Sequence, residues 1–317
     1  MLNIREIRDV NFLDPVPAWS QDGIMAVSPY RDNAGLHLLG RGYTKDATQP
    51  VYNSCIFRAD GENPFEFAIH PTPTLTPGSA GNDDRLACED PTRIPSSHCD
   101  DTFLYSQVRR IPSQEMVTRG KCAEDLGVYV SLGYARKLEN GHLELQKVLE
   151  PTEQRWWGSP IDMCKEGEVL LQPEQEYDTL FYEFADSASS RVAVAKAFFS
   201  GGTSTVRNSA LWLDTRPGKW DSDHVSTGPI VDLGTKKLMF YNGRDSQTWA
   251  IGEVVFDPLT LEVEYRSEEP LIIPPKEIGW ANQFIAFSSG VLIIDGIVHL
   301  YHHIADKRVR CAVGTFK

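Results

Sequence analysis

The stretch Lys237–Val255, KLMFYNGRDSQTWAIGEVV, carries the pattern that decides the fold. An apolar run, Lys237–Asn242, is followed by a polar turn and then by a second apolar run, Thr248–Val255. Both runs are rich in β-branched and aromatic residues, which are enriched in strands. The stretch therefore predicts a strand, a turn and a returning strand.

Four other parts of the chain repeat this arrangement. The copies are Leu36–Tyr43 with Val51–Phe57, Phe103–Val108 with Gly127–Ala135, Thr179–Phe184 with Arg191–Ala197, and Ile297–His303 with Arg308–Val313. Their spacing of roughly 60 to 75 residues is typical of a repeat architecture. We therefore expect an all-β protein, a five-bladed β-propeller in which each blade is a small antiparallel sheet. A pair of β-sandwiches is the alternative, which a repeat of this length disfavours.

The chain has 317 residues, which is more than one hydrophobic core usually contains. Two domains or one large β architecture would both satisfy this length, and the repeat favours a single propeller domain over residues 1–317. Residues 1–35 contain Pro15, Pro17 and Pro29. We expect them to form an irregular lead-in segment around the body of the propeller.

Charge and hydropathy restrict the partners of the protein. The net charge is −13 and the isoelectric point is near 5.1, and no basic run is present to neutralise phosphates. We therefore expect no nucleic-acid partner and no binding to an anionic membrane surface. No stretch has the 18 or more apolar residues that a membrane span requires.

The beginning of the sequence and its cysteines point to the cytoplasm. Residues Met1–Glu6 are mixed and charged, which is unlike a secretory signal. The six cysteines contain no C-x-x-C pair and no zinc-binding spacing. Free thiols in a reducing compartment are the expected state.

The stretch Cys88–Ile94, CEDPTRI, is the strongest candidate for chemistry. Glu89 and Asp90 are adjacent carboxylates, and Pro91 restricts the backbone around them. Elsewhere, short apolar strands deliver a charged residue at or just after their ends: Arg41, Asp245 and Asp306. If these residues meet at the central funnel of a propeller, they form a pocket suited to gripping and cleaving a polyhydroxylated substrate.

An ordered series of motifs gives this chain a resemblance to a known family. The series comprises Leu38–Arg41, Glu89–Pro91, Gly228–Ile230, Tyr241–Gly243, Phe256–Pro258, Tyr265–Pro274, Phe287–Gly290 and Tyr301–Asp306. It resembles glycoside hydrolase family 130, the β-mannoside phosphorylases and β-mannosidases, over nearly the whole chain. The resemblance implies a five-bladed propeller and an oligosaccharide or glycoside substrate.

The resemblance also implies roles for individual residues. Asp90 corresponds to the family's proton donor to the glycosidic oxygen. Inverting cleavage needs such an acid, with a raised pKa, opposite an attacking water or phosphate. Positions that hold the sugar in the family correspond here to Arg41, Glu89, Arg93, Asp245 and Asp306.

Three departures from the family pattern bear on the nucleophile. Thr92 intervenes before Arg93 in the E-D-P-R motif, and Tyr241–Gly243 has asparagine in place of the usual histidine. Phe181–Asp186 is acidic where the phosphorylases have a basic phosphate clamp. Because a phosphate dianion beside Glu183 would be repelled, we favour water as the nucleophile. Glu183 and Glu277 are the candidates for the base that activates it.

Aromatic and histidine residues complete the candidate site. Trp249 and Trp280 follow expected funnel-end turns and are the candidates to stack on a sugar face. His302 and His303 are adjacent in a strand and would face opposite sides, and neither they nor His224 have a third ligand at a recognisable spacing. We expect neither a metal nor a cofactor.

The sequence thus predicts an inverting glycosidase acting on a β-linked glycoside, preferably a β-mannoside, by hydrolysis. One alternative is a β-mannoside phosphorylase that uses inorganic phosphate and forms a sugar 1-phosphate. Another is a non-catalytic propeller that binds sugar or protein, and a third is a propeller glycosidase for furanosides. Relatives often form homo-oligomers, but no interface can be identified in the sequence.

Overall fold

The computed structural model describes residues 1–13, 15–45, 53–78, 85–94, 102–110, 128–138, 140, 142–149, 163–185, 189–200 and 203–317. In these residues the regular structure consists of β-strands and two short 3-10 turns, η1 (Ala18–Ser20) and η2 (Trp280–Asn282), with no α-helix. This confirms the expected all-β class. Trp156 and Trp157 lie outside the described residues.

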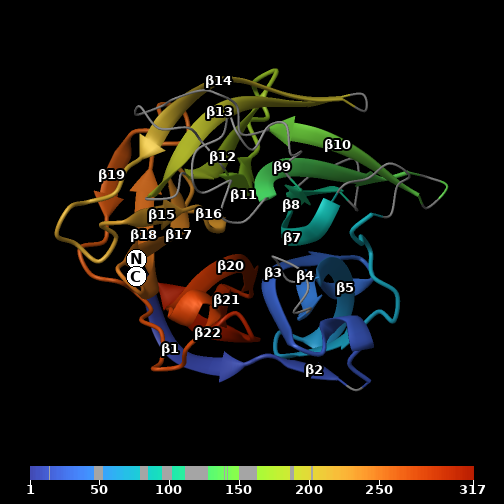
Figure 1. The fold of residues 1–317 in the computed structure, drawn as a ribbon. Helices are drawn as coiled ribbons and strands as arrows, with labels where there is room; N and C mark the ends of the chain where they lie inside the picture. Colours follow the sequence, from blue (N-terminus) through green and yellow to red (C-terminus); the bar gives the residue numbers. More distant parts are fainter. Residues whose placement is uncertain are drawn as a thin grey trace.

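The strands form antiparallel sheets that follow one another along the chain and surround a common centre (Figure 1). The first sheet contains β3 (Gly23–Asp32), β4 (Gly35–Thr44), β5 (Asn53–Asn63) and β6 (Glu66–Ile69), with β2 (Asn11–Leu13) parallel to β6. Next come β7 (Arg85–Arg93), β8 (Thr102–Arg110), β9 (Val128–Lys137) and β10 (Leu143–Leu149). These are followed by β11 (Met163–Leu170), β12 (Asp178–Ala185), β13 (Ser190–Ser200) and β14 (Thr203–Leu213).

The C-terminal half continues the same pattern. β15 (His224–Ser226) and β16 (Ile230–Asp232) both pair with β17 (Lys237–Asp245), which is followed by β18 (Thr248–Phe256) and β19 (Val263–Arg266). The last strands are β20 (Phe284–Ile294), β21 (Ile297–Ile304) and β22 (Arg308–Phe316). β1 (Leu2–Asp9) adds to β22 in antiparallel register, from Leu2 opposite Phe316 to Asp9 opposite Arg310.

Residues 1–35 differ from the irregular lead-in that we expected. They contain β1, β2 and β3, and β1 is a full strand of the last sheet. The prediction took the three prolines as signs of irregular structure. Pro15 and Pro17 do lie between strands, but Pro29 lies within β3. β3 is the edge strand of its sheet and pairs there only with β4, a position where a proline is tolerated.

The strand pairs found in the sequence are the second and third strands of each sheet, namely β4 and β5, β8 and β9, β12 and β13, β17 and β18, and β21 and β22. Their alternating apolar residues identified them. Another strand lies inside each pair, closer to the centre: β3, β7, β11, β15 with β16, and β20 (Figure 1). Arg41, Asp245 and Asp306 therefore belong to second strands or to the turns that follow them, and not to the strands nearest the centre.

The inner strands escaped the sequence pattern because their regular alternation is broken. The pairing register shifts at Met25/Ser28, Glu89/Thr92, Lys165/Glu168 and Ser288/Gly290. Between β15 and β16 the ladder is interrupted at Thr227–Pro229. Such bulges bend a strand and re-aim its side chains, and they are common beside active sites.

Hydrogen bonds between neighbouring sheets pin these irregular segments to one another. The backbone N–H groups of Arg93 and Glu166 donate to Ser28 Oγ (3.0 Å) and Ser106 Oγ (3.4 Å), respectively. The remaining links are Thr227 Oγ1 to the Glu166 carbonyl, the Ser288 N–H to Asn242 Oδ1 (2.7 Å) and the Val27 N–H to Ser289 Oγ (3.0 Å). Each sheet is thus linked to the next and the last to the first, which fixes the geometry at the centre.

Apolar side chains fill the spaces between successive sheets. One core cluster joins β12, β17 and β18 through Phe181, Tyr241 and Phe256, which are all fully buried. Another joins the first sheet to the last through Phe57, Phe67 and Tyr301. No helix in the described part of the chain is long and apolar enough to cross a membrane.

Candidate active site

Asp90 lies in the bulge of β7, at the centre of the molecule. The register of β7 against β8 shifts between Glu89 and Thr92, and Asp90 adopts a left-handed φ of 49°. This conformation costs a residue other than glycine free energy, of order 1–3 kcal/mol for a sparsely populated region. Its side chain is only 8% exposed. The bulge therefore turns a buried carboxyl group away from the regular direction of the strand.

Arg41 of β4 holds both carboxylates of the predicted pair. Its Nη2 contacts Glu89 Oε1, and its Nη1 donates to Asp90 Oδ1 at 3.3 Å. Ser54 Oγ lies 3.4 Å from the same Glu89 oxygen. The structure thus brings Arg41, Glu89 and Asp90 together as the sequence predicted.

The charges around Arg41 act against the effect of burial. Burial alone would lower the pKa of Arg41, but Glu89, Asp90 and Asp306 raise it, so the guanidinium stays charged. Burial raises the pKa of Glu89 despite the opposing effect of Arg41. For Asp90, burial is outweighed by Arg41 and Lys165, and its pKa is lowered, which is the opposite of the raised pKa expected of a general acid.

Glu166 of β11 is a second carboxyl group that reaches Asp90. It also occupies a bulge, between Lys165 and Glu168, and its φ of 51° is left-handed. Asp90 and Glu166 lie close enough for each carboxyl group to affect the pKa of the other. Burial and the nearby Asp90 raise the pKa of Glu166 well above its usual value.

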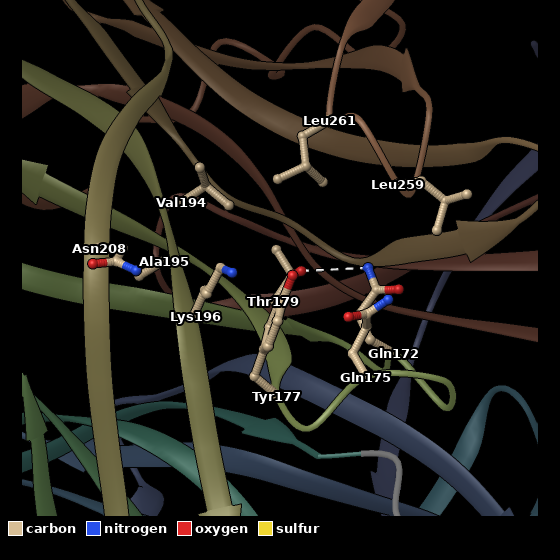
Figure 2. A pocket seen from close by; sticks show the side chains of 10 residues that line it. All are labelled: Gln172, Gln175, Tyr177, Thr179, Val194, Ala195, Lys196, Asn208, Leu259 and Leu261. Atoms are coloured by element: carbon tan, nitrogen blue, oxygen red, sulfur yellow. Dashed lines mark hydrogen bonds between the residues drawn. The ribbon is translucent and has the colours of Figure 1, made fainter.

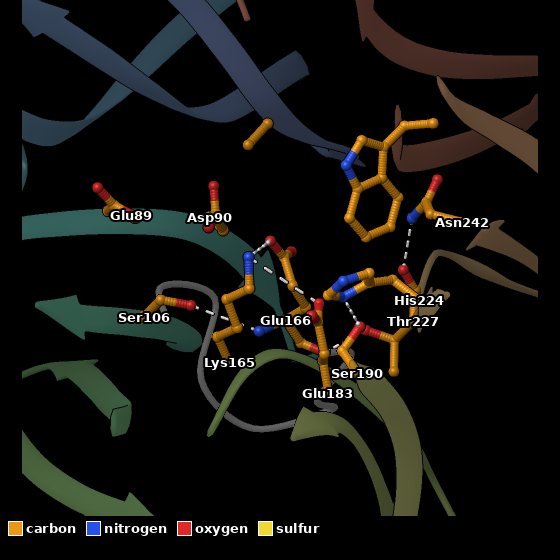
Figure 3. Close-up of polar contacts among 12 residues, drawn as sticks. Glu89, Asp90, Ser106, Lys165, Glu166, Glu183, Ser190, His224, Thr227 and Asn242 are labelled. Carbon is orange, nitrogen blue, oxygen red and sulfur yellow. Dashed lines mark hydrogen bonds and ion pairs between the residues drawn. The ribbon is translucent and has the colours of Figure 1, made fainter. Parts of the chain in front are cut away.

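Lys165 lies between Glu166 and a third carboxyl group (Figure 3). Its Nζ is 3.8 Å from Glu166 Oε1 and 4.0 Å from Glu183 Oε2. Glu183, on β12, is 2% exposed, and its Oε2 has no hydrogen-bond partner among the described residues. This oxygen is therefore available to accept a hydrogen bond from a small molecule.

Asp306 is held at a hairpin tip that faces the same group. Ala305 and Asp306 both have a φ of 52°, as a type I′ turn requires, although neither is the glycine or asparagine usual there. His303 Nε2 lies 3.1 Å from Asp306 Oδ1, and His303 Nδ1 accepts the N–H of Ala26 at 3.3 Å. This arrangement assigns the ring hydrogen to Nε2 and fixes the Asp306 carboxylate near Arg41.

Other predicted residues take different positions. Asp245 is exposed and its Oδ1 accepts the Ser222 hydroxyl at 3.1 Å. The guanidinium of Arg93 lies over the Tyr30 ring, 4.5 Å from its centroid. Glu277 forms an ion pair with Arg308 at 2.8 Å. Among the described residues, no hydrogen bond or salt bridge joins this ion pair to Asp90, Glu166 or Glu183.

The structure describes the side chain of only one of the two tryptophans that were predicted to stack on a sugar. Trp249 is partly buried, its Nε1 donates to Gln283 Oε1 at 3.0 Å, and its ring packs beside His224 and Phe287. Trp280 begins η2, but its side chain lies outside the described residues. Among the described residues no group of three or more His, Cys, Asp or Glu side chains is arranged to hold a metal ion.

A separate pocket of about 240 Å³ opens where β12–β14 meet the turn after β18 (Figure 2). Its lining consists of Gln172, Gln175, Tyr177, Thr179, Val194, Ala195, Lys196, Asn208, Leu259 and Leu261. No lining residue carries a carboxyl group, so this pocket lacks the groups for acid or base catalysis. The carboxyl cluster at the centre is therefore the candidate active site.

Solved structures provide the comparison with known proteins. A β-1,2-mannobiose phosphorylase from Listeria innocua, in complex with β-1,2-mannobiose, aligns with a TM-score of 0.69 at 14% identity, over 92% of this chain and 89% of that one. A structure described under glycoside hydrolases of family 130 that target β-1,2 mannosidic linkages in Candida mannan aligns with a TM-score of 0.69 at 16% identity, over 98% and 94%. This chain has their fold.

A glycosyl hydrolase from Bacteroides ovatus also aligns with this chain, with a TM-score of 0.67 and 17% identity over 94% of this chain and 85% of that one. No protein-family model and no curated protein matches the sequence. The resemblance to glycoside hydrolase family 130 is thus confirmed at the level of the fold.

Sequence reasoning overlooked several residues that the fold brings to the cluster. Glu166 and His303 were not proposed as site residues, and Lys165 was left aside. Arg244 was passed over in favour of Asp245, yet it lies close enough to Glu183 for the carboxylate to affect its pKa, which burial lowers overall. The one available signal was the charged run Lys165–Glu168, KEGE, which interrupts an otherwise strand-like segment as Cys88–Arg93 does.

Proposed function

We propose that this chain is a five-bladed propeller glycosidase, a single domain over residues 1–317, that cleaves a β-linked mannoside with inversion. The observation that carries the proposal is the buried group of Asp90, Glu166 and Glu183 around Lys165, at the place where inner strands bulge. Two carboxyl groups on opposite sides of a glycosidic bond are what inverting cleavage requires. The fold shared with mannoside-active enzymes supports the substrate class.

Each step can be assigned to a residue. Asp90 gives a proton to the glycosidic oxygen as the bond to the anomeric carbon breaks. Glu183 takes a proton from the water that attacks the opposite face of the sugar. Arg41, Glu89 and Asp306 bind the hydroxyl groups of the cleaved sugar, with Trp249 beside it. The products are a free sugar of inverted configuration and an alcohol.

The charge balance favours water over phosphate. In the described part of the cluster, five carboxyl groups face three cationic side chains: Glu89, Asp90, Glu166, Glu183 and Asp306 against Arg41, Lys165 and Arg244. A phosphate dianion entering this group would be repelled more strongly than neutral water. Glu183 is a better base than Glu277 because Glu277 already has Arg308 as its partner.

Phosphate remains the second candidate because of one observation. Lys165 and Arg244 both lie near Glu183, so an ammonium group and a guanidinium group are present on that side of the cluster. If they clamped phosphate, the product would be a sugar 1-phosphate.

The test is turnover of β-1,2-mannobiose and of aryl β-mannosides by the purified protein, with and without inorganic phosphate. We expect phosphate-independent release of mannose, with the α-anomer appearing first by NMR. Phosphate-dependent formation of a sugar 1-phosphate would replace hydrolysis with phosphorolysis. Turnover of arabinofuranosides alone would contradict the mannoside assignment, and binding of mannobiose without turnover would show a non-catalytic propeller.

We also propose the cytoplasm as the location of the protein. The described cysteines Cys55, Cys88, Cys164 and Cys311 are buried free thiols, which is the state expected in a reducing compartment.

A further inference from the structure

The pocket shown in Figure 2 lies between two neighbouring sheets, away from the carboxyl cluster. Thr179 lines it, and four residues of β12 separate Thr179 from Glu183, which is about 13 Å in an extended strand. Val194 and Leu261 belong both to the lining and to the apolar cluster that joins β12, β17 and β18. The pocket therefore begins where the packing between these sheets ends, and it is separate from the candidate active site.

A bulge in β14 shapes one wall of this pocket. The register of β13 against β14 shifts between Val194 and Lys196, where β14 contains one residue more than β13. Asn208 lies in this bulge and has a left-handed φ of 55°. Bulges re-aim side chains and are common beside functional sites. The same combination of a bulge and a left-handed residue places Asp90 and Glu166 in the candidate active site, so the backbone is built here in the way it is built there.

The polar groups of the lining are mainly amides and hydroxyls. The Gln172 amide is held in place, since its Nε2 donates to the Pro258 carbonyl at 2.9 Å and to Thr179 Oγ1 at 3.4 Å. The side-chain amides of Gln175 and Asn208 form no hydrogen bond with a described residue. A side-chain amide both donates and accepts hydrogen bonds, as a sugar hydroxyl does. These two amides are therefore available to a polyhydroxylated ligand.

Aromatic and apolar side chains line the rest of the pocket. Tyr177 lies on one side of it and Leu259 and Leu261 lie on another (Figure 2). Lys196 Nζ is 4.0 Å from the centroid of the Tyr177 ring. A sugar ring has apolar C–H faces as well as hydroxyl groups, so a lining of aromatic, aliphatic and amide side chains is suited to it.

The charges around the pocket favour a neutral ligand over an anion. Lys196 is the one cation among the described lining residues, and the Tyr177 ring is already its partner. Two exposed glutamates, Glu174 and Glu176, precede Tyr177 in the chain. Their negative charges reduce the positive potential that an anion would need. A sugar hydroxyl can still accept a hydrogen bond from the Lys196 ammonium group.

We propose that this pocket is a second sugar-binding site, which holds one neutral hexose unit without cleaving it. Its volume of about 240 Å³ is below the roughly 300–1,000 Å³ of pockets for drug-sized ligands, so a single sugar residue is the appropriate size. Gln175 and Asn208 bind hydroxyl groups, and Tyr177 and Leu261 contact the ring. The inference goes beyond the proposed function, and only the choice of mannosides as the first probes rests on that function.

The first experiment is a titration followed by methyl NMR of the full chain, in which Val194, Leu259 and Leu261 report on the pocket. The neutral probes are methyl β-mannoside, β-1,2-mannobiose, methyl β-glucoside and methyl β-galactoside, and the anionic probe is inorganic phosphate. The Asp90→Asn variant is used so that the disaccharide stays intact. We expect at least one neutral sugar to shift these methyl signals saturably, with a Kd of about 1 mM or less. Shifts with phosphate alone, or no shift with any neutral sugar, would overturn the proposal.

The second experiment repeats the titration in variants of the pocket. Asn208→Gly removes the amide, and glycine accepts the left-handed backbone, so the bulge is retained. Asp295→Gly is the matched control, because Asp295 is also left-handed but lies at an exposed hairpin outside the pocket. We expect Asn208→Gly to weaken sugar binding about threefold or more and Tyr177→Ala to weaken it about tenfold or more. Equal affinities in Asn208→Gly and Asp295→Gly would contradict the assignment.

The activity of the same variants separates this inference from the proposed function. Asn208 and Tyr177 are outside the carboxyl cluster, so hydrolysis of a small aryl β-mannoside should stay within about twofold of its starting value. If no mannoside is cleaved but the pocket signals respond to a neutral sugar, the proposed function fails and the second site stands. If mannosides are cleaved and the signals respond to no neutral sugar, only the second site fails.

Discussion

Asp90 and Glu166 occupy matching positions in neighbouring sheets, each as the left-handed residue of a bulge in an inner strand. Neither is a glycine, so both positions are strained in the same way. At both positions the backbone, and not only the side-chain rotamer, therefore sets where the carboxyl group lies. The predictions below follow from this arrangement and from the contacts around it.

Asp90→Asn should lower turnover of a β-mannoside at least a hundredfold, because removal of a general acid typically costs a factor of 10²–10⁴. The amide keeps the shape of the side chain, and its oxygen can still accept a hydrogen bond from Arg41. The measurement is kcat with an aryl β-mannoside, with the melting temperature as the control for folding. Retention of more than a tenth of wild-type turnover by a folded variant would contradict the role of Asp90.

Glu183→Gln separates the two nucleophiles. If water attacks, the variant loses the base and turnover should fall by a similar factor. If phosphate attacks, no base is required, and phosphate-dependent turnover should persist. Glu264→Gln is the control, since this carboxylate lies on the surface in an ion pair with Lys236.

Glu168 should make the protein less stable as pH rises. Burial raises the pKa of Glu168 to about 8 despite a hydrogen bond from Thr92. In the unfolded chain the group ionises near its ordinary value, so stability is fully present below that pH and is lost as pH rises to about 8. One pKa unit corresponds to about 1.4 kcal/mol, and the total loss is on the order of a few kcal/mol.

The measurement for Glu168 is urea unfolding between pH 4 and pH 9. Glu168→Gln retains the contact with Thr92 and should remove most of this dependence. It should therefore be more stable than the wild type at pH 9. An unchanged slope of stability against pH would show that other groups cause the dependence.

Asp221→Asn should destabilise the fold far more than a surface substitution. Asp221 is completely buried and its carboxylate contacts Arg216, Arg266 and the hydroxyl of Tyr241. Removing one partner of a buried ion pair costs about 3–5 kcal/mol. Asp232→Asn, at an exposed pair with Lys237, should change the free energy of unfolding by less than about 1 kcal/mol. Equal effects of the two substitutions in chemical denaturation would argue against this account.

Much of the fold could be predicted from the sequence because the second and third strands of each sheet have the regular alternation of half-buried strands. The inner strands could not, since bulges at Asp90 and Glu166 and the break at Thr227–Pro229 interrupt that alternation. The structure brings Arg41 into contact with Glu89 and Asp90, three residues that the sequence assigned to one pocket.

The site residues that the sequence did not reveal are brought together only by the arrangement of the sheets. Nothing in the local sequence distinguishes Glu166, which reaches Asp90, from Glu277, which pairs with Arg308. Both are single glutamates in polar segments. Only the arrangement of the sheets around the centre determines which of them meets another carboxyl group.

The pairing of β1 with β22 makes residues 1 and 317 neighbours, and the Lys317 N–H donates to the Met1 carbonyl at 3.2 Å. The two ends are adjacent in Figure 1. A short peptide could therefore join them, and new ends could be opened at the exposed Asp295–Gly296 hairpin. Such a circular permutant would preserve every strand pairing while changing the order in which the ribosome delivers the strands, so the ring itself has no obligatory first segment.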